Sequence, residues 1–423
     1  MRIWQVVAYE PLPRVDGDVR LLRYGTLGTM LAAQGHTVTW WTSNFDHVRK
    51  RHRFDSPPSS MEIQPGLTVK LLPSSGYKRN VSVNRIRHNR SIAHAFEQQS
   101  HECGIQPDIV FACLPTLELA EKSVQYGQRN HIPVIIDVVD KWPDLYLTAF
   151  PRILRSFARM ALFSEFERTR KILQAATAIT AVSNTYLEWA LTYAKRSRQE
   201  TDVVFPLGYA MREMKQKSTG TTLSIRVLSD YGISPDSLLV TFLGQFGASY
   251  DLETVIRAAK ILQKYKNINI QFILGGDGDN SSRLRKMARG LSNVIFTGWL
   301  DQPTMRALLQ ISSLGLATYT NHALQSLPYK PFEYMSAGLP ILSSLKGEME
   351  ALLSDEQIGI QYQAGNVQSL VDGLCWFANN PIARREMGVS ARNIFQKKFS
   401  AEVIYPQLIE YLSKVVGQSK VRV

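Results

Sequence analysis

Short apolar runs and longer amphipathic stretches alternate along the chain, and the whole alternation occurs twice. The first series has strand-like runs at residues 3–8, 37–42, 108–113, 133–139 and 178–182. The second series has them at residues 239–243, 268–274, 294–296, 314–317 and 340–342. Helix-length segments separate most of these runs, and strands joined through helices form parallel, doubly wound sheets. The pattern predicts an α/β protein with two Rossmann-like sheets in tandem.

A Pro-Leu-Gly linker at residues 206–208 and a helix-like C-terminal stretch mark the expected domain boundaries. We expect an N-terminal Rossmann-like domain at residues 1–206, completed by a helix at residues 402–418, and a C-terminal one at residues 207–401. If the two domains face each other across a cleft, the cleft is the expected active site, outside the carboxyl ends of the strands. In the first domain, helices are expected at residues 19–34, 85–103, 116–130 and 152–173.

The composition excludes several classes of protein. Of the 423 residues, 44% are hydrophobic and 20% are charged, which excludes a disordered chain. No stretch of about 18 uncharged apolar residues predicts a transmembrane helix, and the run at residues 3–8 is not a secretory signal. Three cysteines without Cys-x-x-Cys spacing, and histidines without metal-ligand spacing, argue against disulfides and a metal site. We expect a cytoplasmic protein that needs no metal and no cofactor.

The segment QSLPYKPFEYMSAGLPIL, residues 325–342, carries the most chemical information. It predicts a helix at residues 329–337, which the following Gly-x-Pro ends. Lys330 would then lie in the first helical turn, where free backbone N–H groups attract an anion such as a diphosphate. Glu333 would lie on the same helical face, where its carboxylate could accept hydrogen bonds from a ribose diol. The alternative is that the two residues only form a surface pair.

The pattern Pro-x-Lys-x-x-Glu-Tyr-Met-x-x-Gly-x-Pro in this segment resembles the donor-site motif of the retaining glycosyltransferases of family 4, which have the GT-B fold. The resemblance extends over nearly the whole chain, and weaker motifs follow in the family's order and spacing. It implies that a sugar is transferred from a nucleotide-diphosphate donor with retention at the anomeric carbon. The family's roles carry over to Lys330, which would contact the diphosphate, and to Glu333, which would hold the ribose.

The same resemblance implies further donor-site residues. The family usually has a second acid eight positions before the motif glutamate, where this chain has Gln325, which can bind sugar hydroxyls but is no carboxylate. After the strand at residues 239–243, a glycine-rich turn allows close approach to phosphate, with Gln245 and Tyr250 where many relatives have basic residues. The residues expected to bind the donor are Gly17, Gly244, Gln245, Phe246, Gly247, Gly276, Leu300, Gln325, Ser326, Leu327, Pro328, Lys330 and Glu333.

In the first half, the resemblance points to two loops that follow strands. Gly17 occupies the family's glycine-rich loop, where a backbone N–H at a helix N-terminus faces the donor phosphate. Arg20 and Arg23 follow; one of them could face the cleft, and we expect Arg23 to be solvated. Asp140 begins a segment, Asp-Lys-Trp-Pro, that resembles one in polysaccharide-assembly members of the family. Asp140 could accept a proton from the acceptor hydroxyl as a catalytic residue, or it could cap the next helix.

The net charge of +13, from 49 Lys and Arg against 36 Asp and Glu, is concentrated in the first half. Residues 44–90 have ten basic and three acidic side chains, a local +7, and residues 151–173 have six and two, a local +4. The second stretch also carries aliphatic and aromatic residues. It is typical of a basic amphipathic helix on an anionic membrane, or of a helix whose apolar face packs on the core.

Together these features predict a retaining glycosyltransferase, peripheral on the cytoplasmic face of the membrane, that transfers a hexosyl or N-acetylhexosaminyl group. The expected acceptor is a saccharide, lipid-linked, in bacterial surface polysaccharide assembly. A nucleotide-sugar epimerase or a phosphorylase on the same fold is one alternative. A basic nucleic-acid-binding protein is another, but the basic clusters lack interleaved exposed aromatics and a recognition motif, so we expect no nucleic acid partner.

Overall fold

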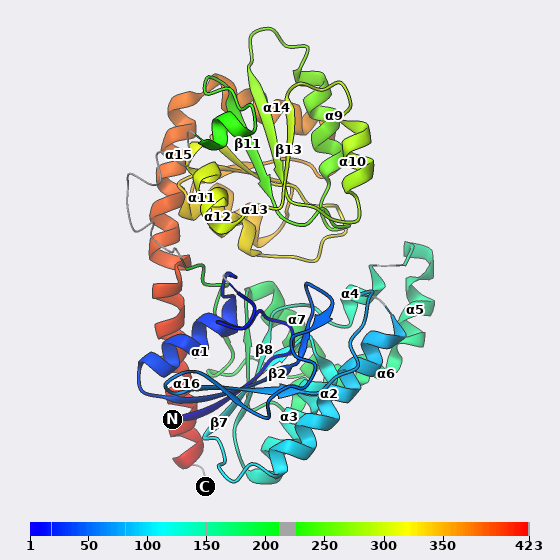
Figure 1. The fold of residues 1–423 in the computed structure, drawn as a ribbon, viewed down its shortest axis with the longest axis vertical. Coiled ribbons are helices and arrows are strands. Elements are labelled where there is room, and N and C mark those ends of the chain that lie inside the picture. Colours follow the sequence, from blue (N-terminus) through cyan, green and yellow to red (C-terminus); the bar gives the residue numbers. More distant parts are fainter. Residues whose placement is uncertain (18, 81, 149, 211–225, 422–423) are drawn as a thin grey trace. The chain divides into compact units, whose positions relative to one another are not determined.

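The structure is a computed structural model that describes residues 1–17, 19–80, 82–148, 150–210 and 226–421. The chain divides into two compact units, each built around its own sheet (Figure 1). Unit 1 contains Met1–Gly208 and the chain from Ile404 onward, and unit 2 contains Tyr209–Val403.

Unit 1 is built on an eight-stranded sheet in the order β10-β9-β8-β7-β1-β2-β6-β5, parallel throughout except for the β5–β6 pair. A short antiparallel ribbon, β3–β4, follows β2. The strands are β1 (Arg2–Val6), β2 (Thr37–Ser43), β3 (Phe45–Asp46), β4 (Arg51–His52), β5 (Met61–Gln64), β6 (Leu67–Leu72), β7 (Ile109–Leu114), β8 (Val134–Val138), β9 (Ala178–Ala181) and β10 (Val203–Val204).

The helices of unit 1 differ from expectation in two places. The first begins at Arg23 rather than at residue 19, and the single helix expected at residues 152–173 is broken into three pieces. The helices are α1 (Arg23–Ala33), α2 (Val83–His101), α3 (Leu117–Asn130), α4 (Asp144–Leu147), the 3₁₀ turn η1 (Arg152–Leu154), α5 (Arg155–Ala161), α6 (Phe163–Ala175), α7 (Asn184–Ala194) and most of α16 (Ala401–Val421).

Unit 2 is built on a six-stranded, fully parallel sheet in the order β13-β12-β11-β14-β15-β16. Its strands are β11 (Leu238–Leu243), β12 (Ile270–Gly275), β13 (Val294–Gly298), β14 (Leu314–Ala317), β15 (Ile341–Ser343) and β16 (Gly359–Gln361). Its helices are α9 (Leu252–Leu262), α10 (Ser281–Met287), α11 (Gln302–Ile311), α12 (Tyr329–Ser336), α13 (Glu348–Asp355), α14 (Val367–Asn379), α15 (Pro381–Ile394) and the π turn η2 (Phe395–Phe399).

The central strands are apolar along their whole length because helices cover both faces of each sheet. All six residues of β7 and all six of β11 are buried. A strand buried on both faces has a continuous apolar run instead of an alternating one. This is why the sequence pattern located these strands.

The strand order of unit 2 indicates where along the carboxyl ends of its strands a ligand would bind. The chain builds outward from β11 through β12 to β13, and then returns to the other side of β11 with β14. In doubly wound sheets, ligands bind outside the carboxyl ends of the strands where this order reverses. For unit 2 that point lies beside the turns that follow β11 and β14.

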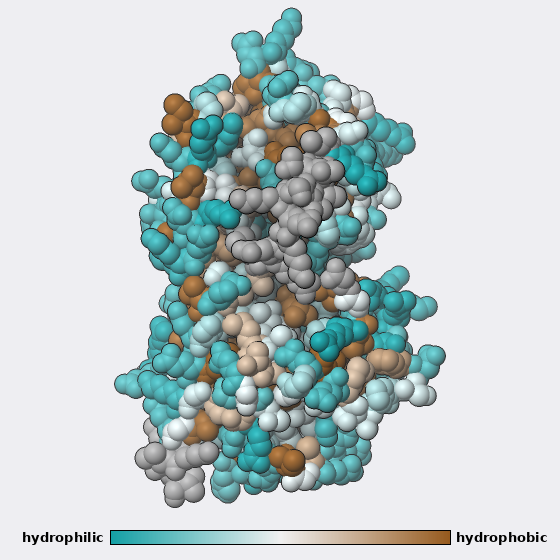
Figure 2. Space-filling model, turned by 60° about the vertical axis from the view of Figure 1, so that its left-hand side comes forward, coloured by the Kyte–Doolittle hydropathy of each residue, from teal (hydrophilic) through white to brown (hydrophobic). Residues whose placement is uncertain are grey.

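Figure 2 shows one face of the molecule, on which hydrophilic residues predominate and hydrophobic ones are scattered among them. Among the described residues, none of the helices is both long enough and apolar enough to cross a membrane.

Candidate functional site

The motif helix α12 begins and ends close to where the sequence predicts. Pro328 is the extended N-cap residue, and the helix runs from Tyr329 to Ser336. Lys330 and Glu333 are each only 8% exposed. They are therefore not a solvated surface pair. Burying two ionic side chains costs free energy, which a bound ligand or polar partners must offset.

The ammonium group of Lys330 reaches across to the end of β11. Nζ donates a hydrogen bond to the carbonyl oxygen of Leu243. It also lies 4.5 Å from the ring centroid of Phe242 and 4.7 Å from that of Tyr250. Such contacts with aromatic faces stabilise a cation that has left bulk water. A fixed positive charge is thereby held beside the glycine-rich turn at the switch point of the sheet.

Gly244 is required by this arrangement. Its φ of +141° is one that residues with a side chain rarely adopt, and a Cβ built on it would lie 2.2 Å from Lys330 Nζ. The absence of a side chain at Gly244 therefore lets the Lys330 ammonium group lie directly against the backbone of the turn. A phosphate oxygen could approach both the lysine and the neighbouring backbone N–H groups there.

The turns after β11, β12 and β13 pack directly on one another. The Gly244 N–H donates to the Gly275 carbonyl at 2.8 Å, and the Gly276 N–H donates to the Gly298 carbonyl at 2.7 Å. A Cβ on Gly276 would lie 1.9 Å from the Gly244 carbonyl oxygen, so only glycine fits. Gly276, expected as a donor-binding residue, thus supports the Gly244 turn directly, and Leu300 lies against Gly275.

The loop before α12 is tied to the helix that follows the next strand. Ser326 Oγ donates to Glu348 Oε1 at 2.8 Å, and Glu348 is the first residue of α13. Gln325 Oε1 is buried without a hydrogen-bond partner among the described residues. Leu327 and Pro328 are half-buried in the same loop. The loop therefore holds an amide that can still bind a hydroxyl group.

A pocket of about 240 Å³ lies beside the β11 turn. Its lining includes Phe246 and Gly247, two expected donor-site residues, together with Tyr250 and Thr320. Tyr250 also contacts Lys330, so the pocket and the lysine share a wall. Gln245, by contrast, is exposed. Sequence reasoning named Tyr250 only as a replacement for a basic residue and missed its part in holding Lys330.

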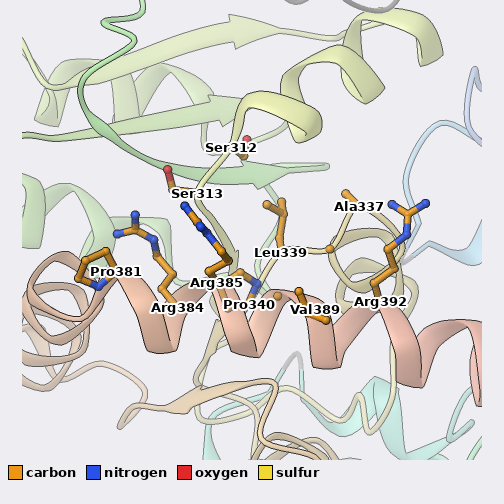
Figure 3. A pocket seen from close by; sticks show the side chains of 12 residues that line it. Ser312, Ser313, Ala337, Leu339, Pro340, Pro381, Arg384, Arg385, Val389 and Arg392 are labelled. Atoms are coloured by element: carbon orange, nitrogen blue, oxygen red, sulfur yellow. The ribbon is translucent and has the colours of Figure 1, made fainter. Parts of the chain in front are cut away.

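A second pocket of unit 2, of about 330 Å³, lies at the opposite edge of the sheet (Figure 3). It is lined by residues that precede β14 and β15, such as Ser313 and Pro340, and by Arg384, Arg385 and Arg392 of α15. No expected donor-site residue lines it. It lies at the amino ends of the strands and is separate from the Lys330 region.

In unit 1, two expectations about the first loop are wrong. Gly17 is exposed with a φ of +84°, and α1 begins only at Arg23, so Gly17 is not at a helix N-terminus. Arg23 is not solvated but 1% exposed. Its Nε and Nη2 donate to the carboxylate of Asp137 at 2.7 and 3.1 Å, and its Nη1 donates to the carbonyls of Phe205 and Pro206. Arg23 joins distant parts of unit 1 and is not a ligand-binding residue.

Asp140 lies at the carboxyl end of β8, where unit 1 would bind a ligand. Burial raises the pKa of its carboxyl to about 6, while the nearby Arg85 guanidinium acts in the opposite direction. The next helix, α4, has no side-chain cap, so capping does not explain Asp140. A carboxyl group with a pKa near 6 is suited to act as a general base near neutral pH.

Among the described residues, no group of three or more His, Cys, Asp or Glu side chains is arranged to hold a metal ion.

Residues 228–394 match the family model described as glycosyl transferases group 1. The O-antigen chain mannosyltransferase C of Escherichia coli is 22% identical over 233 residues. The match covers 55% of this chain and spans only 59% of that relative's length.

Two solved structures share the architecture of the whole chain. Sucrose-phosphate synthase from Thermosynechococcus elongatus has a TM-score of 0.72, 16% identity, and 99% coverage of each chain. Anabaena Alr3699/HepE, in complex with UDP-glucose, has a TM-score of 0.65 and 15% identity, and the match covers 98% of this chain and 100% of that one. The expected GT-B fold, with two Rossmann-like domains, is confirmed. The expected enzyme class is confirmed for residues 228–394, which form a group 1 glycosyltransferase domain.

Proposed function

We propose that this chain, with its group 1 glycosyltransferase domain at residues 228–394, is a retaining glycosyltransferase of family 4. It takes a sugar from a nucleoside diphosphate donor and passes it to a saccharide acceptor. The observation that carries the proposal is the position of Lys330. Its buried ammonium group lies at the first turn of α12 and beside the glycine turn of β11, where the strand order reverses.

In the proposed reaction, the donor diphosphate lies at the Gly244 turn and leaves as the glycosidic bond forms. Lys330 and the backbone N–H groups stabilise its developing charge, which is electrostatic catalysis by groups already in place. Glu333 holds the ribose, and the Gln325 amide binds a hydroxyl of the transferred sugar. The proposal includes no metal ion, because the charge of the leaving group is met by the lysine and the backbone.

The proposed mechanism retains the configuration of the anomeric carbon without a protein nucleophile. The acceptor hydroxyl attacks the anomeric carbon from the face that the diphosphate leaves, and the leaving phosphate takes part in removing its proton. Asp140 is the side chain that we assign to orient or deprotonate the acceptor hydroxyl. Most of the rate enhancement then comes from positioning.

The proposed donor is a nucleotide sugar, and the proposed acceptor is lipid-linked, in the assembly of a surface polysaccharide. The structure of Anabaena HepE in complex with UDP-glucose supports the donor class by fold similarity. The similarity to an O-antigen chain mannosyltransferase supports the acceptor class.

An exposed apolar surface supports attachment to the cytoplasmic face of a membrane. Ile153, Phe157, Met160 and Phe163, here called the α5 patch, are 84%, 66%, 69% and 65% exposed. They lie on η1, α5 and the start of α6 at the outer edge of unit 1 (Figure 1). Their side chains do not face the core, which contradicts the core-packing alternative for these four positions. Apolar side chains beside basic ones favour binding to an anionic membrane.

A transfer assay with labelled nucleotide sugars tests the proposal against its alternative. The protein is incubated with each donor and an extract of lipid-linked saccharides, and the donor products are separated. Label in the acceptor fraction with release of nucleoside diphosphate supports a glycosyltransferase. An epimerised donor without released nucleoside diphosphate would instead establish a nucleotide-sugar epimerase.

A further inference from the structure

Arg85, in the first turn of α2, is a buried cation without an ion pair. It is 9% exposed, and among the described residues no carboxylate lies within 4 Å of its guanidinium group. Its Nη1 donates one hydrogen bond, to the carbonyl of Asn80 at 3.0 Å. An unpaired buried charge destabilises a folded protein. A fold keeps such a charge when something outside the chain pairs with it.

Aromatic rings surround the guanidinium group instead of carboxylates. Its Cζ lies 4.6 Å from the ring centroid of Trp142, 5.1 Å from that of Tyr9 and 5.6 Å from that of Tyr77. Cation–π contacts recover part of the lost hydration but give no acceptor to Arg85 Nε, which has none among the described residues. The ring of His88 lies 5.1 Å from that of Tyr77 and 6.2 Å from that of Tyr9. We call these five residues the Arg85 cluster.

Four buried nitrogen atoms of this cluster have no hydrogen-bond partner among the described residues. They are Arg85 Nε, Trp142 Nε1, and His88 Nδ1 and Nε2. His88 is fully buried and Trp142 is 4% exposed. Arginine and tryptophan side chains only donate hydrogen bonds, so Arg85 Nε and Trp142 Nε1 each lack an acceptor. A water molecule could satisfy one of these groups, but it could not neutralise the guanidinium charge.

Two cations, Arg85 and Lys50, and two carboxyl groups, Asp140 and Glu118, act on the cluster. The Lys50 ammonium group lies 4.7 Å from the ring centroid of Tyr77, and burial together with Arg85 lowers its pKa to about 8. Burial and Arg85 also lower the pKa of His88 to about 4, so this ring is neutral at pH 7. The Asp140 carboxyl lies near enough for Arg85 to influence its pKa, but not near enough to form an ion pair.

The cluster lies at the ligand-binding edge of the unit 1 sheet. Tyr9 follows β1, Tyr77 follows β6 and Trp142 follows β8, so three carboxyl ends of strands converge on Arg85. Ligands of doubly wound sheets bind at this edge. Asp140 belongs to the same loop as Trp142, which places the cluster beside the residue assigned to the acceptor hydroxyl.

We propose that the Arg85 cluster binds a phosphate or diphosphate group, and that this group is part of the acceptor. The second half of the inference rests on the proposed function, and the first half does not. A phosphoryl group offers several acceptor oxygens and a negative charge, which match the unpartnered N–H groups and the two cations. The rings of Tyr9, Tyr77 and Trp142 provide apolar walls. The phosphoryl group could belong to a sugar phosphate or to the diphosphate of a lipid carrier.

The test compares inorganic phosphate and pyrophosphate binding by three forms of the whole chain. Wild type, Arg85→Met and Arg87→Met are titrated at constant ionic strength, and stabilisation is followed by thermal unfolding. Arg87 is exposed on the same helix, so its variant loses the same charge outside the cluster. We expect the affinity for pyrophosphate to fall about tenfold or more in Arg85→Met and to be unchanged in Arg87→Met. All three forms have the same Lys330 region, so its contribution cancels.

Equal stabilisation of all three forms by pyrophosphate would overturn the proposal. If Arg85 has only a structural role, Arg85→Met loses stability and keeps its response to pyrophosphate. If Arg85→Met does not fold, Lys50→Met tests the same site from a loop, and an unchanged affinity in that variant would also overturn the proposal. Because no nucleotide is used, a failure of donor binding is detected separately by the Glu333 variants described below.

The source of the phosphoryl group is tested with two further probes. Glucose 6-phosphate represents a sugar phosphate, and farnesyl diphosphate represents a lipid carrier. The probe that binds wild type more tightly, and loses more affinity in Arg85→Met, identifies the source. If neither probe binds in an Arg85-dependent way, the assignment to the acceptor is wrong.

Discussion

At the residue scale, buried ionic groups in unit 1 have two distinct uses. Arg23 is fully paired, with Asp137 and two carbonyl groups as its partners. Arg85 is buried to nearly the same degree, without a carboxylate partner among the described residues. The first arrangement fixes the fold, whereas the second leaves donor groups for a ligand. Both arginines belong to the positive surplus of the first half, so the net charge alone does not distinguish them.

Arg23→Leu should destabilise the protein strongly, because it leaves the Asp137 carboxylate buried and unpaired. The expected loss is about 3–5 kcal/mol in the free energy of unfolding, measured by urea denaturation. Arg2→Leu is the control, because Arg2 pairs with Asp108 at the surface at 3.4 Å. Its loss should be below about 1 kcal/mol. Equal losses in both variants would refute a specific role for the buried pair.

Gly244→Ala should weaken both donor binding and stability. The added Cβ would overlap Lys330 Nζ, and alanine would be strained at a φ of +141°. We expect a loss of about 1–3 kcal/mol in stability and a markedly lower affinity for nucleoside diphosphate in calorimetric titration. Gly104→Ala, at a position with open space around it, should change neither. A Gly244→Ala protein with wild-type affinity would show that the lysine does not need this turn.

Activity should depend on pH through Asp140. A general base must be ionised, and burial raises the pKa of Asp140 to about 6, so kcat/KM should rise as the pH increases through about 6 and then level off. Asp140→Asn should lower kcat/KM by about 100-fold and remove this rise. Asp55→Asn, at an exposed position, should keep it. A rise at pH 6 that survives in Asp140→Asn belongs to another group.

Residue positions could be predicted from sequence only where a local motif specifies them. Lys330 and Glu333 lie within one helical turn, so their shared face followed from spacing. Arg23 and Arg85 depend on partners far away in the chain, such as Asp137 and Trp142, and no local pattern reports such contacts. For this reason, Arg23 was expected to be solvated and the Arg85 cluster was not foreseen.

At the element scale, the sequence predicted long buried strands well and short or exposed ones poorly. The central strands are continuous apolar runs, and their short length distinguishes them from buried helices. The ribbon β3–β4 has two residues in each strand, and β16 has three, too few to show a periodicity. The start of α1 was placed too early because residues 19–22 continue the helical pattern without forming a helix.

The stretch at residues 152–173 shows how tertiary structure divides an amphipathic pattern. The sequence predicted one helix, but the chain forms η1, α5 and α6. Ile172 and Leu173, late in α6, pack in the core of unit 1, whereas Phe157 and Phe163 are exposed. The apolar residues at the end of the stretch therefore pack on the core, whereas those at its start form an exposed apolar surface.

Phe157→Asp should weaken binding to anionic vesicles if the α5 patch inserts into a membrane. Removing one inserted aromatic side chain should lower the partition coefficient about tenfold or more in a co-sedimentation assay. Ile105→Asp introduces the same change at another exposed apolar residue of unit 1, 65% exposed, and should have little effect. If both variants bind as wild type does, the patch is not the membrane surface.

At the scale of the whole molecule, each unit has chemical groups that suit a ligand at the carboxyl ends of its strands. In unit 2 these groups are Lys330, the Gly244 turn and Glu333; in unit 1 they are Asp140 and the Arg85 cluster. The fold class and the donor motif were accessible from sequence because buried strands and helix starts leave local patterns. The groups of unit 1 were not, because they are assembled from four separate loops and helices.

The central claim is that α12 binds a nucleoside diphosphate through Lys330 and Glu333. Its most direct test is isothermal titration calorimetry with a panel of nucleoside diphosphates on wild type, Glu333→Ala and Glu350→Ala, the last at an exposed position on α13. We predict that wild type and Glu350→Ala bind one base preferentially with equal affinity. Glu333→Ala should keep its fold and lose at least about tenfold in affinity, because hydrogen bonds to a charged group contribute about 1.5–3 kcal/mol. Unchanged affinity in Glu333→Ala, or no binding of any nucleoside diphosphate to wild type, would contradict the account.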